Sequence, residues 1–416
     1  MTSGDRGGLS RRRLFTTGAA LGGGALLAGC ASSSSGSAPG GGPADRVPFH
    51  GHTQTGITSL PVPASGLLAS FTSLAPDRGA LEEMLRELTD EIDGLMSGRP
   101  PRVRDPALPP EDSGLLGAEP PPDDLSIVVG VGASLFDHRY GLAALRPREL
   151  VTMPFLANDR LDPARSHGDV LVSVQARHPD TVVFALRQLM RRTRRTLTLR
   201  WVLDGFGRGS APGESTTGSP RNLLGFIDGT ANLTSSNAAL MDRYVWVAAG
   251  DPEPAWTAGG SYLVVRVIRM FVEFWDRTPL AEQEALIGRH KLSGAPLGRA
   301  SEIDEPDYRA DPDGRITPLD AHIRLANPRT PETAGSLLLR RGFSYTRGFD
   351  GAGALDQGLA FVCYQRSLEA GFLAVQGRLD GEPLEEYVMA EGGGFFFALP
   401  GVRGPGDFLG QDLLRT

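Results

Sequence analysis

One histidine among seven has neighbours that favour cofactor binding. His322 lies in Asp320-Ala-His-Ile-Arg-Leu-Ala-Asn-Pro-Arg329, where two arginines and an Asn-Pro turn accompany the imidazole. This cationic setting suits an anionic cofactor edge such as the propionates of haem, although a lone histidine is more often a hydrogen-bonded or surface residue. His50 and His52 could pair on a metal, but no cysteine or carboxylate reinforces them. The other four histidines have no comparable neighbours: His138, His167, His178 and His290.

Two further polar clusters lie in apolar surroundings. Asp228 stands in Leu224-Gly-Phe-Ile-Asp-Gly-Thr-Ala-Asn232, a pattern that by itself is most typical of a turn or a helix N-cap. Arg340 and Arg341 end the apolar run that begins at Leu337, as charges that protect an edge strand from aggregation often do. None of the three clusters decides a function alone.

The elements that must position these residues fall into two similar halves. In the first, a strand ending at Ser73 precedes a helix with Asp77 as its N-cap, and apolar residues recur every three or four positions from Leu81 to Leu95. Pro179 opens a second helix. The remaining strands of this half are predicted at 125–130, 169–175 and 196–203.

The second half repeats a similar order. Its predicted strands are 244–249, 261–270, 337–345, 359–364 and 395–399, and its predicted helices are 279–287 and 367–376. Strands and helices alternate irregularly, with adjacent strands in places. The pattern therefore predicts an α+β fold with antiparallel sheets covered on one face by helices, and the lack of a Gly-rich phosphate loop argues against a nucleotide fold.

Composition narrows the class of protein. The 416 residues carry a formal charge of −7 and 40% apolar residues, enough for two domains but without the positive excess that nucleic acid requires. Lysine occurs only at Lys291, which we attribute to an arginine-rich composition. Cys363, in an apolar run, is interpreted as a small buried hydrophobe.

The N-terminal sequence predicts an export signal. Ser10-Arg11-Arg12-Arg13-Leu14-Phe15 and the uncharged stretch that follows predict a twin-arginine (Tat) signal peptide over 1–29, since the stretch is too short for a membrane span. Leu27-Ala28-Gly29-Cys30 is similar to a lipobox, so we expect lipidation at Cys30, a disordered tether over 30–47 and an extracytoplasmic, membrane-anchored protein. This export route carries folded proteins, often with a cofactor already inserted.

Together, the three clusters resemble the dye-decolourising (DyP-type) haem peroxidases. The matching segments are Gly225-Phe-Ile-Asp-Gly229, the run around His322, and Arg340-Arg341-Gly342, which begins eighteen residues after that histidine. Shorter matches in the same order extend the resemblance from Pro48 to Gly401. Within the family, the chain is similar to the exported subgroup related to the deferrochelatase/peroxidase of a bacterial iron-uptake system.

The resemblance implies two ferredoxin-like domains, at 48–215 and 221–402, with one haem b per chain held in the second. It implies that His322 is the proximal iron ligand, Asp228 the distal acid/base and Arg340 the distal arginine. Glu386 is the expected carboxylate partner of the imidazole, with Glu385 as the alternative. Six residues match haem-contacting stretches of the family: Gly229, Thr230, Ala231, Asn327, Pro328 and Arg329.

These residue types fit peroxide reduction. An imidazole ligand leaves one face of the iron open, and a carboxylate on its other nitrogen makes it a stronger electron donor. An acid within hydrogen-bond reach can move the peroxide proton, and a guanidinium stabilises developing negative charge. Leu233 stands where the subgroup usually has proline, and His52-Thr-Gln-Thr-Gly56 replaces its His-Gln-Ala-Gly; both departures concern loops outside the three clusters.

Three functions follow as hypotheses. The first is a peroxidase that uses hydrogen peroxide and an organic donor, served directly or through one of Trp201, Trp246, Trp256 and Trp275. The second is an iron-supply protein acting on haem or ferrous iron alongside iron-uptake components. The third is a lipid-anchored solute-binding protein. All three exclude nucleic acid as partner, confine membrane contact to the anchor and are compatible with a homo-oligomer.

Overall fold

The computed structural model describes residues 45–60, 62–102, 104–208 and 215–416. The predicted signal peptide, the lipidation site Cys30 and most of the predicted tether lie outside these residues. Contacts gather Gly41–Thr416 into one compact unit, which is the unit described below. Within the described residues, no helix is both long and apolar enough to cross a membrane.

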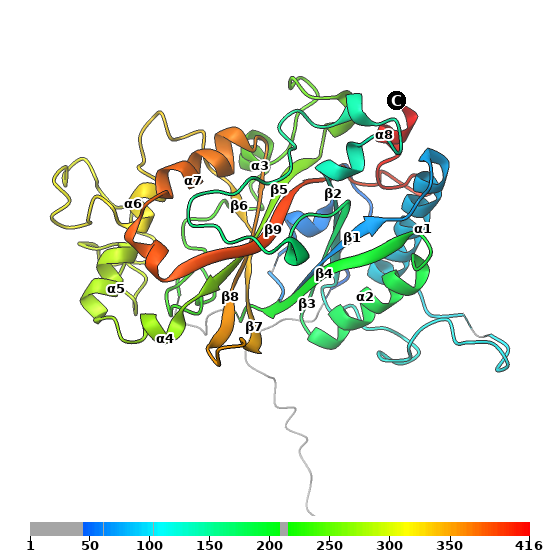
Figure 1. The fold of residues 1–416 in the computed structure, drawn as a ribbon, viewed down its shortest axis with the longest axis horizontal. Helices are drawn as coiled ribbons and strands as arrows, with labels where there is room; N and C mark the ends of the chain where they lie inside the picture. Colours follow the sequence, from blue (N-terminus) through cyan, green and yellow to red (C-terminus); the bar gives the residue numbers. More distant parts are fainter. Residues whose placement is uncertain (1–44, 61, 103, 209–214) are drawn as a thin grey trace, which may run out of the picture. The chain divides into compact units, whose positions relative to one another are not determined.

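The first half of this unit has the strand order of a ferredoxin-like sheet. Its antiparallel strands lie in the order β2-β3-β1-β4, and α1 and α2 are the connections that follow β1 and β3 (Figure 1). Asp77 caps α1 as predicted, accepting a hydrogen bond of 2.9 Å from the Ala80 amide. The elements are β1 (Ser65–Ser73), α1 (Arg78–Ser97), β2 (Ser126–Gly132), β3 (Val170–Ala176), α2 (Pro179–Arg192) and β4 (Leu197–Phe206).

The second half repeats this order with longer connections. Its antiparallel strands lie in the order β9-β5-β8-β7, and the short β6 also pairs with β8. The strands are β5 (Ser261–Met270), β6 (Leu339–Arg340), β7 (Phe343–Phe349), β8 (Leu355–Gln365) and β9 (Val388–Ala398). The helices are α3 (Ala238–Tyr244), α4 (Val272–Trp275), α5 (Leu280–Ile287), α6 (His322–Ala326), a π-helical turn (Glu369–Leu373), α7 (Ala374–Leu379) and α8 (Gln411–Arg415).

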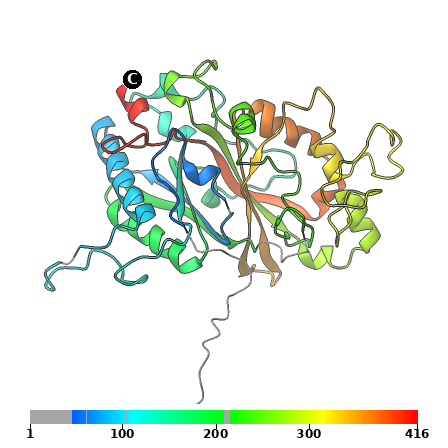
Figure 2. The ribbon, with the colours of Figure 1, turned by 180° about the vertical axis from the view of Figure 1, so that it is seen from behind.

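Pairs between the two halves close the sheet into a barrel-like arrangement. β2 pairs with β9 and β4 pairs with β7, so the order returns on itself through β5 and β8. Alternate residues of β1 face different cores: Leu67 and Ala69 pack under α1 and α2, whereas Leu68 packs with residues of both halves. In Figures 1 and 2, α1 and α2 lie beside the first half, and α4 to α7 lie beside the second. The α+β prediction with ferredoxin-like halves is confirmed.

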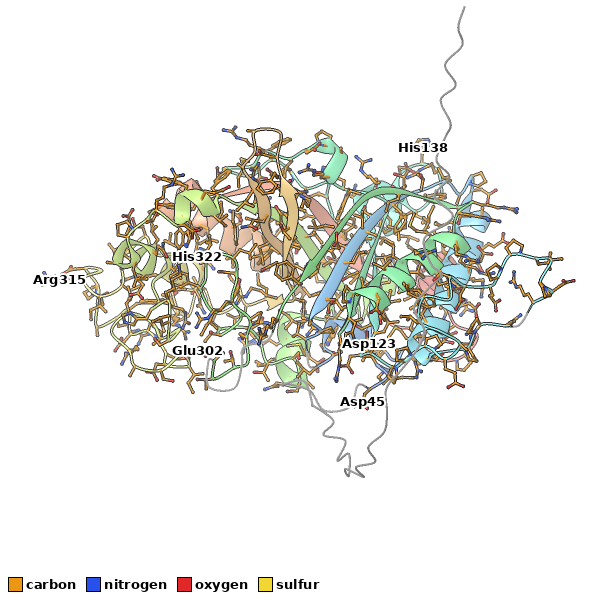
Figure 3. All side chains as sticks on the ribbon, turned by 90° about the horizontal axis from the view of Figure 1, so that it is seen from below. Asp45, Asp123, His138, Glu302, Arg315 and His322 are labelled. Atoms are coloured by element: carbon orange, nitrogen blue, oxygen red, sulfur yellow. The ribbon has the colours of Figure 1, made fainter. Side chains whose placement is uncertain are left out.

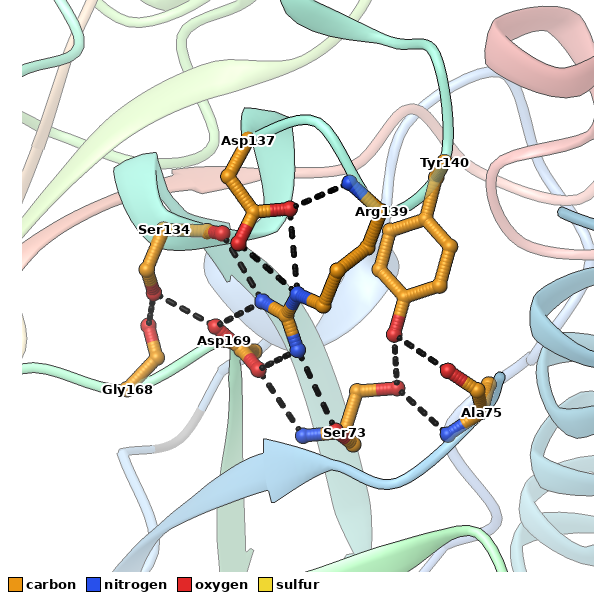
Figure 4. Close-up of polar contacts among 8 residues, drawn as sticks. All are labelled: Ser73, Ala75, Ser134, Asp137, Arg139, Tyr140, Gly168 and Asp169. Atoms are coloured by element: carbon orange, nitrogen blue, oxygen red, sulfur yellow. Dashed lines mark hydrogen bonds and ion pairs between the residues drawn. The ribbon is translucent and has the colours of Figure 1, made fainter. Parts of the chain in front are cut away.

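A polar network fastens the loop after β2 to the first half. Arg139 donates to both carboxylate oxygens of the buried Asp169, and also to the carbonyls of Ser73 and Ser134 (Figure 4). Asp169 in turn accepts from the Ser73 amide at 2.9 Å. The end of β1 and the start of β3 are therefore held together by side chains as well as by backbone pairs.

Two sequence predictions are wrong in detail. Residues 244–249 do not form a strand, because α3 continues to Tyr244 and a turn follows it. The predicted strand 337–345 is broken into β6 and β7 at Arg341 and Gly342. A Cβ on Gly342 would lie 2.7 Å from the Ala360 carbonyl oxygen, so the chain passes too close to β8 there for a side chain.

Candidate active site

His322 is the first residue of α6, and the helix before it fixes its position. α5 ends at Gly288, which adopts a left-handed φ of +90°. A Cβ on this glycine would lie 2.7 Å from Ile323 Cγ1, so α6 rests directly on the end of α5. Ala321, the N-cap residue of α6, is buried at the same contact. Glycine is needed here both for its backbone conformation and for close approach.

Two arginines hold the rest of α6. Arg324 donates to the carbonyls of Thr317 (2.8 Å) and Asp311 (2.9 Å), which ties the preceding loop to the helix. Arg378, from α7, donates to the carbonyls of Leu325 and Ala326, both at 3.0 Å. These carbonyls are among those that a helix C-terminus leaves without partners, so Arg378 caps α6. A five-residue helix thereby becomes a fixed support for the imidazole.

The carboxylate partner of His322 is Glu382. Its two oxygens lie 2.8 and 3.1 Å from His322 Nδ1, and the Glu382 side chain is only 6% exposed. Burial lowers the pKa of His322, but the charge and hydrogen bond of Glu382 outweigh this effect and the net pKa is raised. A carboxylate at Nδ1 keeps the proton on that nitrogen and leaves Nε2 free to bind a metal.

The expectation that Glu386 fills this role is therefore wrong. Glu386 is exposed, and Glu385 instead accepts a hydrogen bond of 3.1 Å from the Gly381 amide. Glu382 has extended backbone immediately before the 3-10 turn Pro383–Glu386, whereas the other two acids lie within that turn.

Asp228 and Arg340 form an ion pair although they lie 112 residues apart in the sequence. Arg340 Nη1 donates to Asp228 Oδ1 at 3.0 Å, and the side chains are 32% and 27% exposed. The loop that carries Asp228 is held by its amide, which donates to the Pro220 carbonyl at 2.8 Å. Gly229 follows with φ +127°, and a Cβ there would lie 2.7 Å from Ser219 Oγ.

The structure brings the three predicted residues into one site. The charges of Asp228 and Arg340 both act on the His322 pKa, in opposite directions and more weakly than burial and Glu382. His322 is itself 34% exposed, so all three polar groups remain partly open. Figure 3 shows His322 and Glu302 in the second half, well away from Asp45 and Asp123. The site belongs to the half predicted to hold the cofactor.

The stretch after Asp228 is anchored by Glu302. This buried carboxylate accepts from Thr230 Oγ1 at 2.8 Å, and it also binds Ser215, Thr216 and Thr217. Burial opposes ionisation of Glu302, but these hydrogen bonds outweigh it and lower its pKa. Ala231 is exposed.

The other predicted stretch follows α6. Asn327 Oδ1 accepts from the Arg329 amide at 3.2 Å across the intervening Pro328, which is partly exposed. Arg329 adopts a left-handed φ of +58°, unusual for a residue with a side chain, and pairs with the exposed Glu305 at 3.0 Å.

A buried arginine lies beside this site. Arg289 is 7% exposed and, within the described residues, forms no ion pair; it donates to the carbonyls of Gly294 and Glu302. Burial is the main cause of its lowered pKa, and the charges of Arg329 and Arg340 lower it further. Three arginines thus lie within electrostatic range of one another, a setting that favours an anionic ligand.

Apolar surface inside the fold is also left partly open. Three apolar side chains on one face of β8 keep some exposure: Leu355, Leu359 and Phe361. Neither α6 nor α7 contains a buried residue. Arg340 of β6 lies opposite Cys363 of β8 in the strand register, so the charged side chain of Arg340 lies near the apolar side chains of β8. A large apolar ring with an anionic edge fits this donor set, and haem has that chemistry.

The remaining candidates from the sequence take other roles. Among the described residues, no group of three histidine, cysteine or acidic side chains could hold a metal ion, and His50 instead lies 3.9 Å from Asp93. Cys363 is fully buried, and burial raises its pKa, as expected for a small hydrophobe. Three of the tryptophans are core residues: Trp201, Trp256 and Trp275.

Comparison with known proteins assigns the class. The family models for the N-terminal and C-terminal parts of Dyp-type peroxidases match residues 54–207 and 219–403. The chain therefore belongs to the DyP-type peroxidase family and is an oxidoreductase that acts on peroxide. Membership implies haem binding and a donor substrate.

Individual relatives are similar over most of their length. The chain is 51% identical to the deferrochelatase of Escherichia coli K12 over 373 residues, covering 89% of this chain and 88% of that one. Ferric DtpA from Streptomyces lividans superposes with a TM-score of 0.80 at 36% identity, covering 90% of this chain and 98% of that one. A DyP-type peroxidase from Cellulomonas bogoriensis gives 0.78 and 37%, covering 90% and 100%.

Proposed function

We propose that each chain binds one haem b through His322 Nε2. Three observations support this: an imidazole whose Nδ1 is held by Glu382, partly open apolar surface on β8, and the buried Arg289, which has no ion-pair partner among the described residues. When bound, haem supplies the iron at which peroxide is reduced and through which electrons reach it from the donor. Glu382 keeps the imidazole in one tautomer and raises its basicity.

Asp228 acts on the peroxide as the acid/base. Its carboxylate, partly open and paired with Arg340 at 3.0 Å, takes the proton from one peroxide oxygen and returns it to the other. The positive charge of Arg340 stabilises negative charge that develops on the departing oxygen. One such donor contributes about 3 kcal/mol in enzymes that stabilise an oxyanion. Overall, one peroxide, two protons and two electrons from the donor give two waters.

Three substitutions test these roles. His322→Ala should abolish haem binding, whereas Asp228→Asn and Arg340→Leu should retain haem and slow the reaction with peroxide about 100-fold or more, as the loss of an acid/base or an oxyanion donor does. His290→Ala is the control, because His290 is in the same half, pairs with Glu284 and is 43% exposed. Stopped-flow rates at the wild-type level in both distal variants would refute the assignment.

A second function, iron removal from haem, is supported by the relatives named deferrochelatase. The comparisons favour both functions over the solute-binding alternative. Incubation of the haem-loaded protein with a reductant in the absence of peroxide separates the two. Release of iron with an intact metal-free porphyrin would identify the deferrochelatase reaction, and oxidation of a donor dye only in the presence of peroxide would identify the peroxidase.

Export through the Tat route and lipidation at Cys30 complete the proposal. Their support is the sequence Ser10–Phe15 and the lipobox-like Leu27–Cys30. Mass spectrometry of the protein isolated from its own membrane tests both, since cleavage before Cys30 with an added diacylglyceryl group is expected. A mature chain that starts elsewhere, without lipid, would contradict the anchor.

A further inference from the structure

The side chain of Asn232 binds both backbone polar groups of Arg340, its amide and its carbonyl. Asn232 Oδ1 accepts from the Arg340 amide at 2.9 Å, and Nδ2 donates to the Arg340 carbonyl at 2.8 Å. Both contacts join segments 108 residues apart. An amide side chain that meets one residue in this way makes the same pair of bonds as a neighbouring strand would make.

β8 pairs with only one edge of the segment that carries Arg340. β6 has two residues, Leu339 and Arg340, and they pair on one side with Tyr364 and Cys363 of β8. The pairing with β8 continues past them in the same register, because the Arg341 amide donates to the Val362 carbonyl at 2.8 Å and Phe343 of β7 pairs with Ala360. The amide of Asn232 occupies the other edge of β6 at Arg340.

Asn232 also belongs to the loop that carries Asp228. Its backbone amide donates to the Gly229 carbonyl at 3.1 Å, which closes the turn directly after Asp228. Asn232 Oδ1 additionally accepts from the Leu233 amide at 3.0 Å, which limits rotation of the side chain. One residue therefore connects the loop of the acid to the strand of the arginine.

We propose that Asn232 is a positioning residue that sets the geometry of the Asp228–Arg340 pair. This inference rests on the proposed roles of Asp228 and Arg340. The ion pair alone does not fix the arginine, because its long side chain can reach a carboxylate from many backbone positions. The two bonds from Asn232 fix the Cα from which the Arg340 side chain starts, and so the direction from which its guanidinium approaches.

Two variants separate the bonds. Asn232→Asp keeps an acceptor for the Arg340 amide but sets an oxygen against the Arg340 carbonyl, whereas Asn232→Ala removes both partners. Asn237→Asp is the matched control: it adds the same charge five residues away, and aspartate can still cap α3 as Asn237 does by accepting from the Leu240 amide.

The first measurement uses the haem-free protein. Hydrogen exchange followed by mass spectrometry on peptides that cover Leu339–Gly342 reports the Arg340 amide. We expect exchange to rise about 10-fold in Asn232→Ala, as the loss of one net hydrogen bond implies, and to change less in Asn232→Asp. Exchange at the wild-type level in the alanine variant would show that the bonds do not hold β6.

The second measurement uses ferric haem-loaded protein and fluoride, an anion that binds the iron and accepts hydrogen bonds from groups beside it. Fluoride affinity should fall about 10-fold in both Asn232 variants, as expected when one hydrogen bond to an anion is weakened, and stay unchanged in Asn237→Asp. A role confined to stability would lower Tm but leave the fluoride affinity of the folded fraction intact.

The outcomes distinguish this inference from the function on which it rests. If Asp228→Asn and Arg340→Leu lose fluoride affinity and peroxide reactivity while both Asn232 variants keep them, the positioning role is refuted and the catalytic roles stand. If Asp228→Asn and Arg340→Leu also behave as wild type, the catalytic roles fail. Should Asn232→Ala not fold, the isosteric Asn232→Asp still decides the question.

Discussion

Glu382→Gln should weaken haem binding, and the adjacent acids provide a test of specificity. Both Glu382 oxygens lie within hydrogen-bond distance of His322 Nδ1, and the carboxylate is 6% exposed. The substitution keeps the shape but removes the charge, and half of its amide orientations set a donor against the Nδ1 proton. Glu386→Gln makes the same chemical change at an exposed position of the same segment.

The magnitude follows from the bond that is lost. A hydrogen bond to a charged group contributes about 1.5–3 kcal/mol, and each 1.4 kcal/mol is a factor of ten. The expected loss in haem affinity is thus about 10–100-fold, the range found when residues that orient a metal ligand are replaced. Glu386→Gln should stay within about twofold of wild type, because an exposed surface substitution changes free energies by less than about 0.5 kcal/mol.

Titration of haem-free protein with haemin, followed in the Soret band, measures both affinities. Competition with a protein of known haem affinity extends the range if wild-type binding is too tight. Equal affinities for Glu382→Gln and wild type would refute the argument, as would a larger loss in Glu386→Gln. A second readout is the Fe–imidazole stretching frequency of the ferrous protein, which should fall in Glu382→Gln because the imidazole becomes less basic.

Three further perturbations test the supports around the site. Lys291→Arg should lower the free energy of unfolding by about 1–3 kcal/mol in calorimetry, as overpacking does. The reason is that the Lys291 Cε already occupies the space that a Cβ on Gly225 would take. An unchanged Tm would show that there is room for the guanidinium. Glu302→Gln should lower the free energy of unfolding by about 1.5–3 kcal/mol in urea at pH 7, and by less at acidic pH. The reason is that the lowered pKa of Glu302 contributes stability above the unfolded-state pKa, and this contribution is lost as pH falls. A loss of stability that does not depend on pH would contradict this. Burial, and secondarily the charge of Arg200, lowers the pKa of His167, so stability is lost as pH falls below 6.5. His167→Asn should reduce the slope of stability against pH by up to about 1.4 kcal/mol per pH unit, and asparagine tolerates the left-handed φ of +61° at this position. An unaltered slope would show that another group titrates.

Strong local signals were sufficient to predict several of the regular elements. The strand 261–270 matches β5 at both ends, and the N-cap at Asp77 begins α1 as expected. In both cases the periodicity of apolar residues coincides with a clear boundary residue. Where a tertiary contact decides the conformation, local pattern was insufficient: Gly342 breaks the strand 337–345 because of the β8 backbone, which the sequence does not reveal.

The choice among the acids near His322 shows the same limit. Glu382, Glu385 and Glu386 lie within five residues, and each is compatible with the motif. The structure selects Glu382 because it precedes the 3-10 turn in extended conformation and lies buried against α6, 60 residues earlier in the chain. No local property of the sequence distinguishes an acid that enters such a turn from the two within it.

Lys291 has contacts that composition alone does not indicate. A single lysine among 42 basic residues was attributed to an arginine-rich composition. In the structure its ammonium donates to Gln283 at 2.6 Å and lies over the rings of Phe226 and Trp275, beneath the loop of Asp228. A compact ammonium on a thin stem fits there, whereas a planar guanidinium needs more room.

The two faces of the site are held by separate sets of contacts. On the side of His322, the supports are Glu382, Arg378 and the end of α5; on the side of Asp228, they are Asn232 and Glu302. Within the described residues, no hydrogen bond joins Glu382 or Arg378 to Asn232 or Glu302, and the link between the two sides is Arg289, which follows Gly288 and donates to the Glu302 carbonyl at 3.1 Å. The proximal supports should therefore govern how tightly haem is held, and the distal supports should govern what happens to a ligand beside it. Because sites without shared partners act nearly additively, this separation lets haem retention and peroxide chemistry be altered independently.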